Sequence, residues 1–280
     1  MNAPLQAQYF SNPSTSETFS QAIKDMPVLE NYAFGTGPGR NVTDLSALKA
    51  TFSPYGIAGT IVINKEWERY QPINPSNFAL TPNSLNLTAT IPQGGGLFPG
   101  GINSGQIWTK QTFQPGKDGR VVYAFEVRMK VPPGAGMWPA AWLFTKIPGI
   151  CDTSEIDNPE FFNMKWQNEF DWTSTLHGPG VGPLAYSIRT NPWVWHPGLN
   201  FSADYHNYQT LWTEDMVYCY LDGTLLSSQA FKWTSKGEAQ FGINLAVGSS
   251  DTANLPGLQP NSLNEFPAAL SVEHFTIWAQ

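Results

Sequence analysis

The chain has 280 residues, of which 41% are hydrophobic and only 13% charged, with 25 glycines and 23 prolines. This composition favours many short strands joined by turns over long helices. The net charge of −7 excludes nucleic acid as a partner, because no basic stripe is available to contact phosphates. No apolar run reaches the roughly eighteen residues that a membrane-spanning helix needs, so no membrane partner is expected either.

The chain reads as one domain with a short leading segment. Residues 1–27 are rich in Ser, Gln, Asn and Thr and are predicted to be a loose N-terminal lead-in. Residues 28–280 contain no linker, repeat or composition break and are assigned to a single domain. Short helices are predicted near 17–24 and 45–51. Strands are predicted at 59–64, 84–90, 105–110, 121–131, 140–144, 155–162, 173–177, 208–212, 217–221, 240–247 and 269–278.

Two local patterns identify the fold class. Residues 121–131 alternate, with apolar side chains at the odd positions and Glu126, Arg128 and Lys130 on the other face, as in a strand that is buried on one side. The dipeptide Asp222-Gly223 between two predicted strands is typical of a tight hairpin turn. Many antiparallel strands with frequent turns predict an all-β sandwich of two sheets.

Three carboxylates lie close together in a chain that is otherwise poor in charge: Glu155, Asp157 and Glu160. On a regular strand the first two share one face and Glu160 points to the other. One extra residue in a β-bulge returns Glu160 to the same face, and Pro159 suits a bulge because it has no N–H to give to the ladder.

Such a row of acids fits the hydrolysis of a glycosidic bond, which uses two carboxyl groups in different protonation states. A third acid between them helps to separate their pKa values. Four strand steps of roughly 3.3 Å place the outer Cα atoms about 13 Å apart, so the glutamates must lean towards each other on a curved strand. A solvated acidic strand face is the competing interpretation.

The surrounding segments resemble glycoside hydrolase family sixteen, whose core motif is E-x-D-x-x-E on one strand of a concave sheet. The resemblance covers residues 60–280. Residues 136–143 are similar to the family's G-x-W-P-A-x-W-L signature, and residues 174–180 to its T-x-H-G-P-G segment. Residues 104–110 and 244–248 also fit. The departures are Ser154 before the first acid, a changed lead into it, and Asn158-Pro159 in place of an apolar pair, and they bear on the substrate more than on the chemistry.

The resemblance implies a β-jelly roll with a substrate cleft and a reaction that retains the anomeric configuration. By position, Glu155 is the nucleophile, Asp157 the assisting acid and Glu160 the general acid/base. The implied substrate-binding residues are Trp138, His177, Trp67, Glu66, Trp142 and Asn244. Catalysis requires no cofactor, and a structural calcium near Glu273 on the convex side is implied as an option.

The expected function is an endo-acting hydrolase of β-1,3-glucan or mixed-linkage β-1,3/1,4-glucan, working as a secreted, extracellular or periplasmic monomer on a polysaccharide substrate. A hydrolase of an agar- or carrageenan-type galactan, or of a bacterial exopolysaccharide, stays open as an alternative. A non-catalytic carbohydrate-binding protein on the same sandwich is the alternative from another class, and retention of all three acids argues against it. The two cysteines, Cys151 and Cys219, are expected to be unpaired and buried.

Overall fold

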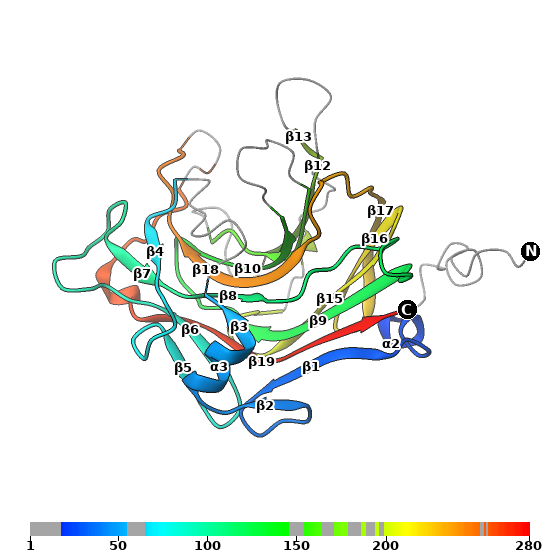
Figure 1. The fold of residues 1–280 in the computed structure, drawn as a ribbon. Helices are drawn as coiled ribbons and strands as arrows, with labels where there is room; N and C mark the ends of the chain where they lie inside the picture. The colour runs from blue at the N-terminus through cyan, green and yellow to red at the C-terminus, as the bar shows by residue number, and fades with distance from the viewer. Residues whose placement is uncertain are drawn as a thin grey trace, which may run out of the picture.

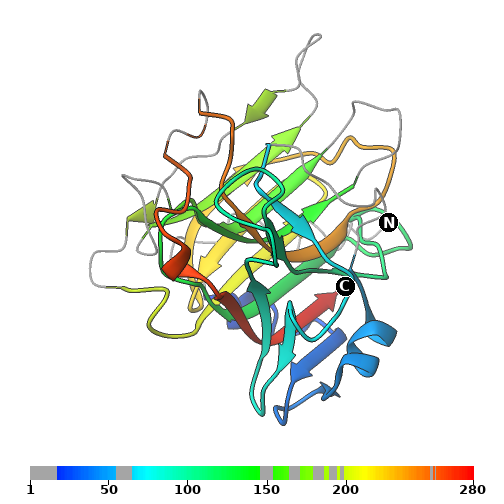
Figure 2. The ribbon, with the colours of Figure 1, turned by 90° about the vertical axis from the view of Figure 1, so that its left-hand side faces the viewer.

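The computed structural model describes residues 18–54, 65–145, 154–163, 171–178, 186–188, 194–195, 199–252, 255 and 257–280. Two large β-sheets pack face to face as layers, and one of them is strongly curved, as Figures 1 and 2 show. The jelly-roll sandwich predicted from the sequence is confirmed. We call the curved sheet the cleft sheet and the other the back sheet. The strand predicted at 59–64 and Cys151 lie outside the described residues.

The cleft sheet has the strand order β13-β12-β11-β10-β18-β8-β3, with β14 beside β12, and its pairs are antiparallel. Its strands in chain order are β3 (Phe52–Ser53), β8 (Gln106–Thr109), β10 (Met137–Phe144), β11 (Glu155–Glu160), β12 (Asp171–Gly178), β13 (Tyr186–Ile188), β14 (Val194–Trp195) and β18 (Gln240–Val247).

The back sheet has the order β17-β16-β15-β9-β19-β1-β2, and β6 joins it beside β19 with β5 beyond. Its strands are β1 (Val28–Phe34), β2 (Arg40–Val42), β5 (Phe78–Leu80), β6 (Leu85–Ala89), β9 (Val122–Lys130), β15 (His206–Thr213), β16 (Met216–Leu221), β17 (Thr224–Ala230) and β19 (Ala268–Ala279). A small parallel pair, β4 (Glu68–Tyr70) with β7 (Ile102–Ser104), lies beside the cleft sheet in Figure 1. The short helices are α2 (Phe19–Ala22), α3 (Leu45–Thr51) and the 3-10 turn η1 (Leu263–Glu265).

The hydrophobic core fills the space between the sheets because alternate residues of both sheets point inwards. Phe241 of the cleft sheet stacks on Phe125 and Phe275 of the back sheet, with ring centroids 5.4 and 4.5 Å apart. The predicted hairpin is confirmed, since Leu221 pairs with Thr224 and both Asp222 and Gly223 have positive φ.

The outer face of the back sheet differs in part from the expected wet surface. Val122 and Ala124 are fully buried there, beneath Phe19 of α2. The backbone N–H of Phe19 donates to the carbonyl of Gly223 at 2.9 Å, which fastens α2 to the β16–β17 hairpin. Residues 18–26, within the predicted lead-in, therefore pack against the sheet and cover apolar positions that the alternation assigned to solvent.

Candidate active site

The three acids lie on β11 with a bulge between the second and the third. Between Asp157 and Glu160, β11 advances three residues while β12 advances two, from Thr175 to Thr173. The partner on the other side, β10, shows the same mismatch between Trp142 and Ala140. The extra residue brings Glu160 to the face that carries Glu155 and Asp157, so the predicted bulge is confirmed.

Asn158 fixes the bulge to the opposite sheet. Its side chain is buried, and Nδ2 donates to the carbonyl of Gln209 at 2.8 Å and to Oγ1 of Thr210 at 2.9 Å. Both acceptors belong to β15 of the back sheet. The polar residue that departs from the family's apolar pair thus has a structural role, because it bonds the bulge to β15 across the sandwich.

Glu155 and Asp157 form one hydrogen-bonded carboxyl pair. Burial, together with the charge of Asp157, raises the pKa of Glu155 well above its usual range. Burial, followed by the charge of Glu160, raises the pKa of Asp157. Since two carboxylates in contact repel each other, each of the two groups holds its proton more firmly than an isolated carboxyl group does.

His177 of β12 completes this group. Its Nε2 lies 3.0 Å from Oδ2 of Asp157, and its electrostatic interaction with Glu155 partly offsets the rise in the pKa of that carboxyl group. Glu155 is the direct strand partner of His177, which explains why the two face the same way. One carboxylate oxygen of Glu155, one of Asp157 and one ring nitrogen of His177 all lie within 4.8 Å of one another.

Trp138 of β10 contacts the third acid. Its Nε1 donates to Oε1 of Glu160 at 2.9 Å, and its ring packs on Phe162 with centroids 5.1 Å apart. Trp138 is only 6% exposed, so it offers little bare ring surface to a sugar. The residue expected to contact the sugar is placed instead to orient Glu160.

Trp142 is the more accessible of the two tryptophans in the signature segment. It lies on the cleft face of β10, half-buried, between Trp108 and Phe144 at centroid distances of 4.9 and 5.0 Å. The sequence analysis named neither Trp108 nor Phe144 as a site residue. Trp108 and Gln106 are two residues apart on β8, so both lie on the cleft face.

Residues 71–244 match the family model described as Glycosyl hydrolases family 16. The chain belongs to this family. Glucan endo-1,3-beta-glucosidase A1 of Niallia circulans is 27% identical over 236 residues, which are 78% of this chain and 33% of that protein. Endo-1,3-1,4-beta-glycanase ExsH of Rhizobium meliloti is 26% identical over 214 residues, 72% of this chain and 42% of that protein. The matched region therefore spans less than half of either relative.

The family's fold is also evident from solved structures. The crystal structure of endo-1,3-beta-glucanase from Streptomyces sioyaensis aligns over 90% of this chain and 96% of its own, with a TM-score of 0.67 and 19% identity. At that identity the likeness shows the fold alone.

Trp67 and Glu66, which the family resemblance also implied, lie beside the C-terminal end of β18. The backbone of Trp67 donates to the carbonyl of Val247 at 3.0 Å, and its indole Nε1 donates to Oγ of Ser250 at 2.9 Å. Glu66 forms an isolated bridge with Ser249. Both side chains are half-buried, so the structure leaves part of each accessible.

Asn244 lies on the cleft face but is buried beneath β4. Its Nδ2 donates to the hydroxyl of Tyr70 at 2.7 Å, and Tyr70 is hydrogen-bonded to Glu68. Burial raises the pKa of Glu68 to about 8, although the backbone N–H of Val247 donates to its Oε2 at 2.8 Å. Asn244 therefore supports the wall of the site. The sequence analysis did not assign Glu68 and Tyr70 to the site, because a strand as short as β4 has no pattern that shows which of its side chains are buried.

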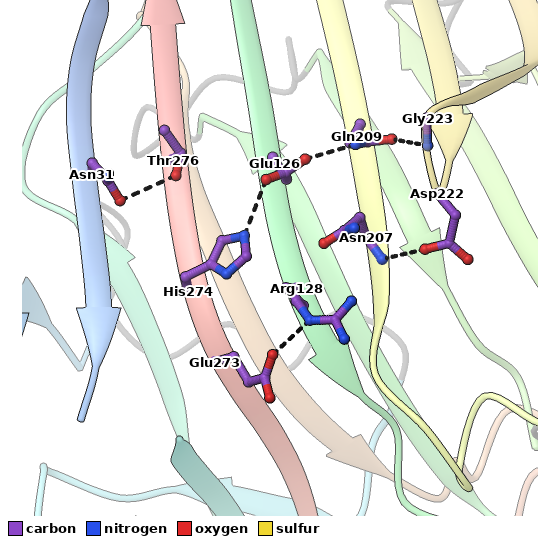
Figure 3. Close-up of polar contacts among 10 residues, drawn as sticks. All are labelled: Asn31, Glu126, Arg128, Asn207, Gln209, Asp222, Gly223, Glu273, His274 and Thr276. Atoms are coloured by element: carbon purple, nitrogen blue, oxygen red, sulfur yellow. Dashed lines mark hydrogen bonds and ion pairs between the residues drawn. The ribbon is translucent and has the colours of Figure 1, made fainter. Parts of the chain in front are cut away.

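Glu273 does not fit a calcium ligand in this chain. Nε of Arg128 on β9 lies 2.6 Å from Oε2 of Glu273 on β19, as Figure 3 shows. A guanidinium already pairs with this carboxylate, whereas a Ca²⁺ ion takes roughly six to eight oxygen ligands. The same face carries a second chain of bonds, from His274 through Glu126 and Gln209 to the backbone of Gly223.

Proposed function

We propose that this chain is a retaining, endo-acting glycoside hydrolase of β-1,3-glucan or mixed-linkage β-1,3/1,4-glucan. The observation that carries the proposal is the bulged β11, which presents Glu155, Asp157 and Glu160 on one face of the curved sheet. Membership of the family supports the chemistry, and the names of the relatives in Niallia circulans and Rhizobium meliloti support the substrate class.

In the first step, the carboxyl group of Glu160 protonates the glycosidic oxygen and the carboxylate of Glu155 attacks the anomeric carbon. The bond to the leaving sugar breaks and a covalent glycosyl ester forms on Glu155. In the second step, Glu160, now ionised, takes a proton from water, and the water oxygen displaces Glu155. Two inversions at one carbon retain its configuration.

The surrounding groups prepare the two glutamates for different roles. A proton shared by the Glu155–Asp157 pair serves the reaction when it resides on Asp157, because Glu155 is then an anion that accepts a hydrogen bond. The indole N–H of Trp138 holds Glu160 at the other end of the row. Nε2 of His177 lies 3.0 Å from Oδ2 of Asp157, so the imidazole limits the space in which this carboxyl group can move.

The remaining parts of the proposal concern the setting in which the chain works. We infer that it acts as a monomer on an extracellular polysaccharide, since a polymeric substrate does not enter cells intact. Within the described residues, no helix has the length and hydrophobicity to cross a membrane. Size-exclusion chromatography with light scattering checks the monomer.

The decisive experiment incubates wild type, Glu155→Gln and Glu160→Gln with laminarin, mixed-linkage β-glucan, agarose, carrageenan and xyloglucan. New reducing ends and product sizes are measured, and NMR of the first product gives its anomeric configuration. Glu214→Gln, at an exposed position just after β15, is the control. We expect oligosaccharides of retained configuration from laminarin or mixed-linkage glucan with wild type and control only.

Other outcomes separate the alternatives. Cleavage of a galactan alone keeps the mechanism and replaces the substrate. Retained binding of a polysaccharide without cleavage of any favours the non-catalytic carbohydrate-binding alternative. Full activity of Glu155→Gln contradicts the assignment of the nucleophile.

A further inference from the structure

A glycine-rich loop between β6 and β7, residues 92–101, holds an aromatic side chain out in solvent. Phe98 is 48% exposed, and among the described residues only Val28 and Leu263 are large hydrophobic side chains of similar exposure. A single exposed hydrophobic side chain is common on protein surfaces, so exposure alone gives Phe98 no role. What distinguishes Phe98 is the glycine backbone that supports its ring and the place of this loop beside Trp67.

The loop is built to support this ring. The N–H of Gly96 donates to the carbonyl of Gly101 at 3.0 Å, and the N–H of Gly101 donates to the carbonyl of Phe98 at 2.9 Å. A Cβ atom on Gly96 or on Gly101 would lie 2.9 Å from the ring of Phe98. The ring therefore rests against bare glycine backbone, and its position depends on both residues lacking side chains.

The loop continues the row of candidate site residues across the cleft sheet. The N–H of Gly100 donates to the carbonyl of Trp67 at 2.7 Å, and Trp67 is bonded in turn to Val247 of β18. β18 pairs with β10, and β10 with β11. Three strand spacings of about 4.8 Å place Trp67 roughly 15 Å from the acids, and Phe98 lies beyond it. In Figure 1 this loop extends outwards beside β4 and β7.

A cation lies beside the loop that carries the ring. The guanidinium of Arg69, an exposed residue of β4, lies so close that a Cβ on Gly100 would be 2.8 Å from it. A guanidinium offers five N–H donors in a planar fork, which suits neighbouring hydroxyl oxygens of a sugar. The face of a pyranose that carries C–H groups packs on an aromatic ring.

We propose that Phe98 and Arg69 form a distal sugar-binding subsite, which extends the cleft past Trp67 and binds a hexopyranosyl residue of the glucan chain under cleavage. This inference rests on the proposed function. The occupant is a sugar because the site is one ring and one cation on glycine backbone. The surface that one ring and one guanidinium can cover is far smaller than the roughly 800 Å² that each partner buries in a stable protein interface.

The test compares a long and a short substrate. Wild type, Phe98→Ala and Phe98→Trp are assayed on laminarin and on a β-1,3-linked trisaccharide, which is too short to reach from the acids to the loop. We expect Phe98→Ala to raise KM for laminarin about three- to tenfold at unchanged kcat. Its kinetics on the trisaccharide stay at wild-type values, and Phe98→Trp restores KM for laminarin. Val28→Ala, at a similarly exposed position on β1 of the back sheet, is the control.

The outcomes distinguish this inference from the proposed function. Unchanged KM of Phe98→Ala on laminarin, with active wild type, overturns the subsite and leaves the hydrolase intact. Equal losses on both substrates, or a lowered melting temperature, mean that the ring supports the fold, and overturn it as well. A concentration-dependent change in sedimentation of wild type that Phe98→Ala abolishes identifies a self-association surface instead.

If wild type cleaves none of the polysaccharides, the proposed function fails, and affinity electrophoresis in gels containing laminarin tests the subsite directly. Weaker retardation of Phe98→Ala than of wild type then supports the sugar site. Equal retardation, or none for either protein, overturns it.

Discussion

Trp138 and Glu160 are joined by a hydrogen bond of 2.9 Å from the indole Nε1 to the carboxylate Oε1, between neighbouring strands β10 and β11. The donor is almost fully buried, so it cannot turn away to water. This bond fixes the direction of the acid that we assign to proton transfer.

Trp138→Phe is expected to lower kcat about tenfold, because a hydrogen bond to a charged group contributes about 1.5 kcal/mol and the acid loses its orientation. Steady-state kinetics on the preferred glucan measure the effect. Trp278→Phe, which changes the same residue type on the back sheet, keeps the wild-type kcat. A rise of KM alone, with kcat preserved, contradicts the orienting role.

Asn158→Ala removes two buried hydrogen bonds that join the bulge to β15 and is expected to cost about 2–3 kcal/mol of unfolding free energy. It should also lower kcat, because Glu160 follows the bulge. Asn77→Ala is a matched control, since buried Asn77 donates in the same way to a carbonyl, of Thr88, and a hydroxyl, of Thr90. Urea unfolding and kinetics should show similar losses of stability, with loss of kcat for Asn158→Ala alone.

Asp157→Asn is expected to move the acid limb of the kcat/KM profile to lower pH, besides reducing its maximum. The charge of Asp157 raises the pKa of Glu155, and without it Glu155 ionises more readily. The pH dependence of kcat/KM is measured from the acid side. Asp204→Asn, at an exposed position before β15, leaves the limb where it is. A shift to higher pH with Asp157→Asn contradicts the coupling.

Glu68→Gln is expected to become more stable relative to wild type as pH rises. The pKa of Glu68 is raised from 4.5 to about 8 in the folded state, so the folded protein binds more protons than the unfolded one. This contribution to stability is present below pH 4.5 and is lost as pH rises through about 8. The difference is on the order of several kcal/mol. Urea unfolding of both proteins at several pH values measures it, and parallel curves contradict it.

Chelation of calcium is expected to leave the melting temperature unchanged, because Glu273 already forms an ion pair with Arg128. Thermal unfolding is followed with EDTA and with added CaCl₂. Arg128→Met, which frees the carboxylate, should lower stability by up to about 1 kcal/mol, because the pair is partly exposed. Destabilisation of wild type by EDTA would falsify this account and point to calcium held by other groups.

Local patterns in the sequence determined the fold class, most of the long strands and the row of acids. Alternation along β9, the Asp222-Gly223 turn and the bulge at Pro159 depend on backbone geometry over a few residues, which sequence alone specifies. The short strand β4 was missed because its partner β7, which lies farther along the chain, stabilises it rather than its own pattern.

Only the tertiary structure decided what each side chain of the site does. Trp138 proved buried against Glu160, Asn244 covered by Tyr70, and Glu273 paired with a cation from another strand. Burial and hydrogen-bond partners come from segments that lie apart in sequence: Asn158 reaches β15 about fifty residues on, and Trp67 reaches Ser250. No local pattern encodes such contacts, because they exist only once the two sheets have packed.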